Sequence, residues 1–381
     1  MVWVGAQTAA RAGPSRPGQR LVNNRAGSPA LASYEIIPRQ PDHDEQLFAL
    51  YAAVFGEERA QASRARWAWQ YTYNPLAATP AVWAAREAGG DGALLGQMAS
   101  MPVTLWWGDR EVRASWGMDF FVRKQAEGRG LGPMLVRTWI DSVDAALAIG
   151  LTPPAHALYR RLGFRDVGAV PFFLKVLDHG AVARRRLGKL PGTLVAPLLR
   201  VGLALRTGRW SEPRPGVEVR PVSTLGAEHD ALWESARGSY AMCVRRDAAY
   251  LRWKYLEAPH RQYELLEARR DGAVVGLAVS RHEHYRGLRL GWLIDAFADA
   301  SDAAARVALV SAVLGRFREA GVARVQAYAM SAALQDTLRQ FGFFAGPSTA
   351  LFCVKTAADA QAPFDDPGRW HVTFGDSDQD R

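Results

Sequence analysis

The chain repeats one pattern at a spacing of about 180 residues. Asp91-Gly-Ala-Leu-Leu-Gly96 recurs as Asp271-Gly-Ala-Val-Val-Gly276. Two further pairs of segments match in the same order: Trp69-Gln-Tyr71 with Trp253-Lys-Tyr255, and Leu162-Gly163-Phe164 with Phe341-Gly342-Phe343. A chain of 381 residues is also long enough for two ordinary domains. The sequence therefore predicts a tandem duplication of one unit.

Each copy is expected to fold as a mixed α/β sheet covered by helices, because strand-rich stretches alternate with helical ones. Strands are expected near residues 34–37, 82, 94–105 and 112–122 in the first copy, and near 217–222, 263, 274–280 and 288–297 in the second. A long amphipathic helix follows in each (Leu131 to Ala146; Ala303 to Ala320), and closing strands complete both. The predicted organisation is a disordered tail (1–32), a first unit (33–178), a basic apolar connector (179–214), a second unit (215–356) and a solvated acidic tail (357–381).

Three glycines stand at alternate positions between an apolar strand (116–122) and the long helix of the first copy. Gly128, Gly130 and Gly132 allow a tight turn, so that backbone N–H groups and a helix N-terminus converge on one point. Such a point binds phosphate or diphosphate. A Walker A loop is excluded because Pro133 follows where Lys is required, and the dinucleotide fingerprint is excluded by the glycine spacing.

The segment from Val122 to Gly132 resembles the acyl-CoA loop of the GNAT family of N-acyltransferases. It departs from that pattern at Glu127, where the family usually has Arg or Gln. A second signature of the family is matched by Tyr159-Arg-Arg-Leu-Gly163-Phe164, although Thr152 stands where Asn is commoner. The resemblance implies acetyl-CoA as co-substrate, held by these residues: Phe121, Val122, Glu127, Gly128, Arg129, Gly130, Leu131, Gly132 and Pro133.

The same resemblance implies two candidate catalytic residues. In the family, a β-bulge before the loop opens a pair of strands, and a backbone N–H there polarises the thioester carbonyl. Tyr159 is the expected acid for the departing thiolate. Asp119, which interrupts an apolar strand near the expected bulge, is the candidate base or holds a water that accepts the proton. Asp295 has the comparable place in the second copy, which leaves a structural role for both open.

The second copy lacks the chemistry of the first. The region after Asp299 lacks glycines at alternate positions, and Leu338 takes the position of Tyr159. We therefore expect the second copy not to bind CoA productively. His282 and His284 lie on one face of a strand, but a polar strand face is favoured over metal binding, and no metal site is expected.

The net charge of +9 does not indicate nucleic-acid binding, because it is concentrated outside the predicted units. Residues 1–34 hold four Arg and residues 181–209 hold seven basic residues, with no acid in either stretch. The connector 188–209 is apolar between basic ends, which leaves packing across both units or contact with an anionic membrane surface open. Only Cys243 and Cys353 are present, so a reducing, cytoplasmic compartment is expected.

The sequence thus favours an N-acetyltransferase that acts on a primary amine, an amino sugar or another small amine. Two alternatives remain open at this point. One is an acyl-CoA-binding sensor or scaffold without turnover, suggested by Glu127. The other is a peptidyl transferase that uses aminoacyl-tRNA on a similar doubled fold, which would need a basic groove on the folded units. The sequence does not indicate an oligomeric state.

Overall fold

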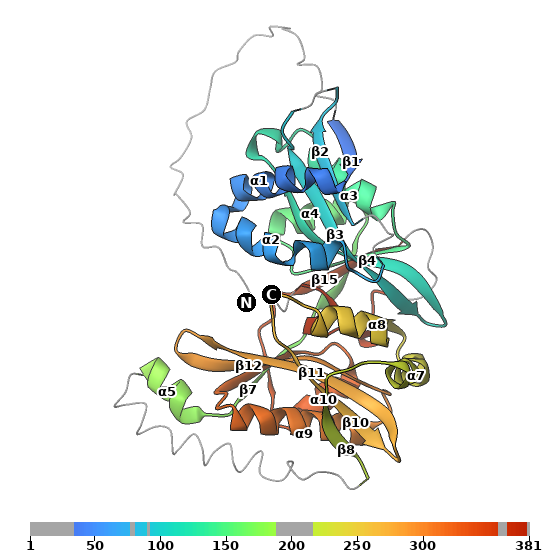
Figure 1. The fold of residues 1–381 in the computed structure, drawn as a ribbon, viewed down its shortest axis with the longest axis vertical. Helices are drawn as coiled ribbons and strands as arrows, with labels where there is room; N and C mark the ends of the chain where they lie inside the picture. Colours follow the sequence, from blue (N-terminus) through green and yellow to red (C-terminus); the bar gives the residue numbers. More distant parts are fainter. Residues whose placement is uncertain (1–33, 77–80, 90–91, 188–215, 357–363, 379–381) are drawn as a thin grey trace, which may run out of the picture.

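Two mixed sheets lie one above the other, with helices between them and on their outer faces (Figure 1). The computed structural model describes residues 34–76, 81–89, 92–187, 216–356 and 364–378. The predicted tail 1–32 and the connector segment 188–209 lie outside these residues. Mixed sheets covered by helices are the α/β class that the sequence predicted, and that prediction is confirmed.

The first sheet contains β1 Tyr34–Pro38, β2 Val82–Glu87, β3 Gly96–Trp107, β4 Arg110–Val122, β5 Ala145–Ile149, β6 Arg165–Ala169, β9 Met242–Val244, β15 Leu351–Thr356 and β16 Trp370–His371. The second contains β7 Phe172–Val176, β8 Glu218–Val222, β10 Glu264–Arg270, β11 Ala273–Tyr285, β12 Leu288–Ala298, β13 Arg324–Tyr328 and β14 Phe344–Gly346. The α-helices are α1 Asp44–Phe55, α2 Glu57–Tyr71, α3 Leu131–Ile140, α4 Pro153–Arg161, α5 His179–Leu187, α7 Ala227–Ala236, α8 Ala248–Leu251, α9 Ala303–Glu319 and α10 Ala332–Gln340. Short helical turns are η1 Pro41–His43, η2 Lys124–Ala126, η3 Arg237–Ser239, η4 Arg252–Leu256, η5 Pro367–Arg369 and η6 Phe374–Asp376.

The two copies exchange a closing strand, and the second copy also supplies β9, which pairs with β3 of the first sheet. The first sheet has the order β1-β2-β3-β4-β5-β15-β6, and the second has the order β14-β7-β13-β12-β11-β10-β8. Thus β15, from the second copy, pairs with β5 through Phe352 opposite Ile149, whereas β7, from the first copy, pairs with β13 through Phe173 opposite Ala327. The expectation that each copy closes its own sheet is therefore wrong. Both sheets depend on a strand from the other copy.

Buried apolar side chains of both copies merge into one core where the inner faces of the sheets meet. Trp69, Trp116, Trp253, Phe352 and Trp370 all belong to it. A separate cluster lies under α3 and α4 on the outer face of the first sheet, and another lies under α9 and α10 on the second. The shared core makes the two copies one packed body.

Two sequence predictions need correction. The helix expected from Leu131 to Ala146 ends at Ile140, because Ala145–Ile149 forms the buried strand β5. The C-terminal segment is not a solvated acidic end over the residues described: Trp370 and Asp376 are 1% and 2% exposed. Instead β16 pairs with β9, and η6 packs beside β12 of the second sheet.

Candidate active site

The glycine loop joins β4 to α3 on the outer side of the first sheet. After Val122 the chain makes the turn η2, and Gly128 and Gly130 then adopt φ angles of +73° and +86°. An L-amino-acid side chain is strained at such angles, so glycine is needed at both positions. The helix α3 begins directly afterwards at Leu131, with Gly130 as its N-cap.

The loop leaves a run of backbone donors free. The N–H groups of Ala126 and Glu127 donate to the carbonyls of Arg123 and Lys124, and the next bonded N–H is that of Met134, which donates to Gly130. Within the described part of the chain, no hydrogen bond engages the N–H groups from Gly128 to Gly132. Free amides at a helix N-terminus bind anions well, because the helix dipole adds partial positive charge there.

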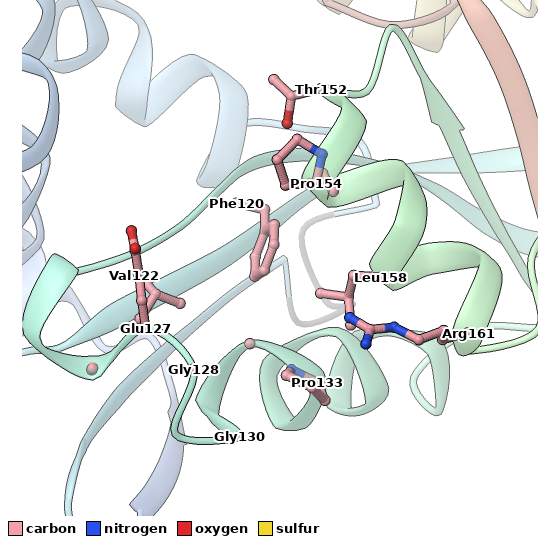
Figure 2. A pocket seen from close by; sticks show the side chains of 13 residues that line it. Phe120, Val122, Glu127, Gly128, Gly130, Pro133, Thr152, Pro154, Leu158 and Arg161 are labelled. Carbon is pink, nitrogen blue, oxygen red and sulfur yellow. The ribbon is translucent and has the colours of Figure 1, made fainter. Parts of the chain in front are cut away.

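A cavity of about 540 Å³ opens beside these amides, between the loop and α4 (Figure 2). Its walls come from the end of β4, the loop, the start of α3 and one face of α4. The lining residues are Phe120, Val122, Ala126, Glu127, Gly128, Gly130, Gly132, Pro133, Thr152, Pro154, Ala155, Leu158 and Arg161. Its size and its mixed lining fit an elongated ligand that has an anionic end.

The cavity brings together most, but not all, of the residues predicted to hold the donor. Val122, Glu127, Gly128, Gly130, Gly132 and Pro133 line it. Phe121 does not: its ring lies 5.3 Å from that of Tyr51 and 5.0 Å from that of Phe55, on the opposite face of the sheet. Its neighbour Phe120 lines the cavity in its place, because side chains alternate along a strand.

Two other predicted residues, Leu131 and Arg129, do not line the cavity. The Leu131 side chain is fully buried in the core beneath α3. Arg129 is exposed, and its side chain is not among the lining groups. Arg161 and Phe120 line the cavity but were missed from the sequence. The helical spacing of Leu158 and Arg161 was the one signal that could have pointed to Arg161.

The second predicted feature, an opening between strands, is present beyond the middle of β4. Its pairing with β5 runs from Ala114 opposite Ala145 only to Trp116 opposite Leu147, although both strands continue. On its other edge, β4 has a register shift against β3, where Gln97 faces Phe121 and Ala99 faces Met118. This β-bulge contains Asp119, whose φ of +44° is unusual for a residue with a side chain.

Asp119 lies at the bulge and faces away from the cavity. Its carboxylate Oδ2 accepts a hydrogen bond of 2.9 Å from the Tyr71 hydroxyl on α2, and its carbonyl accepts one of 3.3 Å from the Gln97 side chain. Phe120, next in sequence, points to the opposite side and lines the cavity. A carboxylate and a donor cavity therefore lie on opposite faces of one strand, beside the opening between β4 and β5.

The Tyr159 hydroxyl does not reach the cavity. The side chain is 1% exposed, and its oxygen lies 3.9 Å from Met98 Sδ. The rings of Phe164 and Trp139 lie 4.7 Å and 5.9 Å away, so burial raises the pKa of Tyr159 far above its ordinary value of 10. The expectation that this hydroxyl faces the sulfur of the donor is not supported by its position.

Other polar side chains beside the loop and on α4, and His284 in the second copy, have structural partners. Arg123 donates from Nε to the Leu94 carbonyl at 2.8 Å, and a His156 ring nitrogen lies 2.8 Å from an Asp166 carboxylate oxygen. His284 contacts the Arg289 guanidinium at 2.8 Å. In the part of the chain that the structure describes, no group of three or more His, Cys, Asp or Glu side chains is arranged to hold a metal ion.

In the second copy, the helix start that corresponds to the glycine loop is capped by a side chain among the described residues. At the start of α9, the Asp302 carboxylate accepts from the N–H of Ala305 and pairs with Arg270 at 2.8 Å. A carboxylate thus caps the helix end where an anion would bind, and it would repel phosphate. Leu338, at the position of Tyr159, is fully buried.

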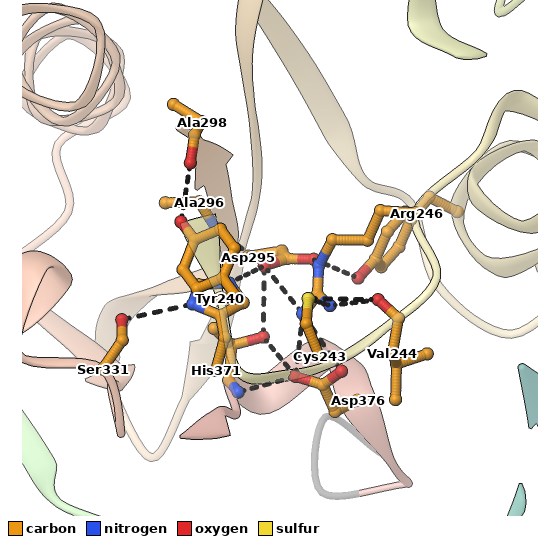
Figure 3. Close-up of polar contacts among 12 residues, drawn as sticks. Tyr240, Cys243, Val244, Arg246, Asp295, Ala296, Ala298, Ser331, His371 and Asp376 are labelled. Atoms are coloured by element: carbon orange, nitrogen blue, oxygen red, sulfur yellow. Dashed lines mark hydrogen bonds and ion pairs between the residues drawn. The ribbon is translucent and has the colours of Figure 1, made fainter. Parts of the chain in front are cut away.

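Asp295, the counterpart of Asp119, belongs to a buried polar cluster that the sequence did not reveal (Figure 3). Arg246 pairs with Asp295 and with Asp376, both at 2.9 Å, while the Thr373 hydroxyl donates to Asp295 at 3.2 Å. The Arg246 guanidinium holds the pKa of Asp295 well below its usual range, against the opposing effect of burial. Residues His371 and Thr373 from the C-terminal segment thus pack against Asp295, and its carboxylate is held by partners from the chain itself.

Residues 35–167 match a family model described as an acetyltransferase (GNAT) domain. None of the curated proteins compared has a matching sequence.

Solved structures match most of the chain, and the likeness extends over both sheets. A GCN5-related N-acetyltransferase from Anabaena variabilis matches with a TM-score of 0.58 at 12% identity, over 85% of this chain and 72% of that one. One from Kribbella flavida gives 0.55 at 14%, over 86% and 72%. Saccharomyces cerevisiae N-myristoyltransferase with bound myristoyl-CoA gives 0.52 at 15%, over 87% and 84%. At these identities the likeness shows a shared, doubled GNAT-like fold.

Proposed function

We propose that the chain transfers an acyl group, acetyl in the simplest case, from acyl-CoA to a primary amine, and that only the first copy carries the reaction. The observation that carries the proposal is the set of free N–H groups from Gly128 to Gly132 at the mouth of the cavity. They fit the diphosphate of CoA, since an oxyanion there satisfies donors that the protein leaves open.

The opening between β4 and β5 lets donor and acceptor meet. A pantetheine chain that starts at the loop and follows the cavity reaches the bulge at Phe120, beyond the point where the pairing of β4 with β5 ends. The amine approaches from the face of α2, where Asp119 and Tyr71 lie. Asp119 attracts the ammonium and receives its proton, directly or through a water, before attack.

In the transfer step, the neutral amine attacks the thioester carbonyl, a C–N bond forms, and the C–S bond breaks. The developing oxyanion is stabilised by a backbone N–H of the bulged strand. Asp119 passes the first proton to solvent and can then accept the second proton that the amine loses, while the thiolate takes a proton from solvent. Tyr159 is not needed in this scheme, because its hydroxyl is enclosed by the core.

One experiment tests donor binding and a second tests turnover. Mass spectrometry of the native purified protein, followed by titration with CoA, is expected to show one CoA per chain. Two binding sites would contradict a single active copy. Absence of CoA binding would remove the proposal. Thiol release from acetyl-CoA is then measured with a panel of amino sugars, polyamines and short peptides.

An acyl-CoA-binding sensor is the second candidate, and one observation favours it. Glu127 lines the cavity next to the proposed diphosphate site, where its charge weakens donor binding. Tight CoA binding without thiol release for any amine of the panel would support the sensor over the enzyme.

The excess positive charge lies in residues 1–34 and 181–209, outside the two predicted units, so it gives no support to the tRNA-dependent alternative. The cavity of about 540 Å³ is also far smaller than a groove that holds a nucleic acid. No helix among the described residues is long and apolar enough to cross a membrane. Contact of residues 188–209 with a membrane surface remains a prediction, because these residues lie outside the described ranges.

A further inference from the structure

One face of α4 lines the donor cavity. Pro154, Ala155, Leu158 and Arg161 all contribute to its wall, and their spacing places them on one side of a helix. Arg161 is in the last turn of α4 and is exposed to the cavity mouth. It is the basic side chain among the cavity-lining groups that the structure describes.

The neighbouring polar side chains of α4 are engaged elsewhere. Arg160 donates to the Phe164 carbonyl at 3.2 Å and lies 3.8 Å from the Asp166 carboxylate. His156 contacts the same carboxylate. Among the described residues no hydrogen bond or ion pair engages Arg161. The two adjacent arginines therefore differ: Arg160 stabilises the turn that follows α4, whereas Arg161 faces the cavity.

Arg161 lies close to the start of α3. The Leu158 side chain is 3.7 Å from the position that a Cβ on Gly132 would take. Arg161 follows Leu158 by one helical turn on the same face, and Figure 2 shows its guanidinium above Pro133, at the first turn of α3. An anion on the free amides of the loop is thus within reach of this side chain.

The charges around the cavity make such a contact necessary. A helix N-terminus supplies about half a positive charge, whereas both phosphates of the donor are negative and Glu127 lines the same cavity. Arg123 is occupied by the Leu94 carbonyl. A guanidinium fork matches phosphate oxygens and compensates for the nearby carboxylate.

From this geometry we propose that Arg161 binds the diphosphate of the acyl donor, so that α4 shares the phosphate site with the glycine loop. The proposal rests on the proposed function, since it concerns how the same donor is held. It assigns Arg161 as a binding residue for the diphosphate, not for the 3′-phosphate.

Calorimetric titration of the full chain with CoA and with 3′-dephospho-CoA tests this assignment. Arg161→Ala is expected to weaken both ligands by roughly tenfold, the effect of one charged hydrogen bond of about 1.4 kcal/mol. Arg160→Ala is the matched control and is expected to bind both ligands as the wild type does. Arg161→Lys should recover part of the loss.

Three results would overturn the assignment: unchanged affinity in Arg161→Ala, an equal loss in Arg160→Ala, or a loss for CoA alone, which would place Arg161 at the 3′-phosphate. A wild-type chain that binds neither ligand would instead remove the proposed function. Because Arg161 is exposed, the variants are expected to fold, and circular dichroism checks this.

Discussion

Trp69 and Trp253 each donate a hydrogen bond from the indole Nε1 to the other's backbone carbonyl, at 2.7 Å and 2.8 Å. Their rings stack with centroids 5.0 Å apart. Trp69 and Trp253 occupy matching positions in the two repeated segments of the sequence. A two-fold relation between the copies would therefore produce such a reciprocal contact. It joins the ends of α2 and η4 at the centre of the shared core.

Replacing one partner of this pair should destabilise the whole chain. We expect Trp253→Ala to lower the free energy of unfolding by about 3–5 kcal/mol, because it leaves a large cavity and removes one of the reciprocal bonds. Urea denaturation measures the effect. Tyr73→Ala, at a side chain that is 67% exposed, is the control and should change stability little. Separate transitions for two halves would contradict a shared core.

Gly130 should be intolerant of a side chain although space is available for one. At a φ of +86°, alanine costs about 1–2 kcal/mol, and relaxation of this strain would move the amides of the loop. Gly130→Ala is therefore expected to weaken CoA binding roughly tenfold in titrations. Gly315→Ala, inside the helix α9, should instead stabilise the fold by about 0.5–1 kcal/mol and leave CoA affinity unchanged.

Asp119→Asn should slow transfer without weakening the donor complex. A lost general base reduces the rate by about 100-fold or more, whereas the cavity proposed for CoA lies on the other face of β4. The measurements are thiol release with an amine active in the panel, and CoA affinity. Asp141→Asn, an exposed substitution at the end of α3, serves as the control. Full activity of Asp119→Asn would assign this residue a structural role, like that of Asp295.

Tyr159→Phe should retain most of the activity. The hydroxyl contacts Met98 Sδ at 3.9 Å in the core, and the variant keeps the ring that packs on Phe164. The same thiol-release assay decides the question. A drop of about 100-fold or more would restore Tyr159 as the acid, and would imply that Phe120 or Met98 moves when the donor binds.

His371 should make stability fall on mild acidification. Burial and the nearby Arg246 charge lower its pKa below the ordinary value of 6.5, so the unfolded chain binds a proton more readily than the folded one. This contribution to stability is present above pH 6.5 and is lost as the pH falls below it, by at most about 1.4 kcal/mol per pH unit. Urea midpoints at pH 7, 6 and 5 measure the slope. His371→Gln should flatten it, and an unchanged slope would assign the effect to other groups.

Local pattern and repetition predicted the sheets and the glycine loop because both depend on residues that are adjacent in sequence. The φ angles that Gly128 and Gly130 adopt are an example. The strand exchange could not be predicted in this way, since β7 and β15 are equally suitable for either sheet. The choice between them depends on packing across the shared core.

The same limit applies to side-chain direction at the site. The motif placed Tyr159 correctly on α4, but the aromatic cluster of Trp139 and Phe164 decides that its hydroxyl is enclosed. The burial and ion pairing of Asp376 could not be predicted from the sequence either. Its partner Arg246 is 130 residues away, and no local pattern links the two residues.

The reciprocal strand exchange has a consequence for the history of the chain. Two identical subunits that swap their last strands form a closed dimer, in which every exchange is made twice. Joining such subunits end to end yields the present connectivity without any rearrangement of the sheets. In such a fused chain each half still depends on the other, because β15 completes the first sheet and β7 completes the second.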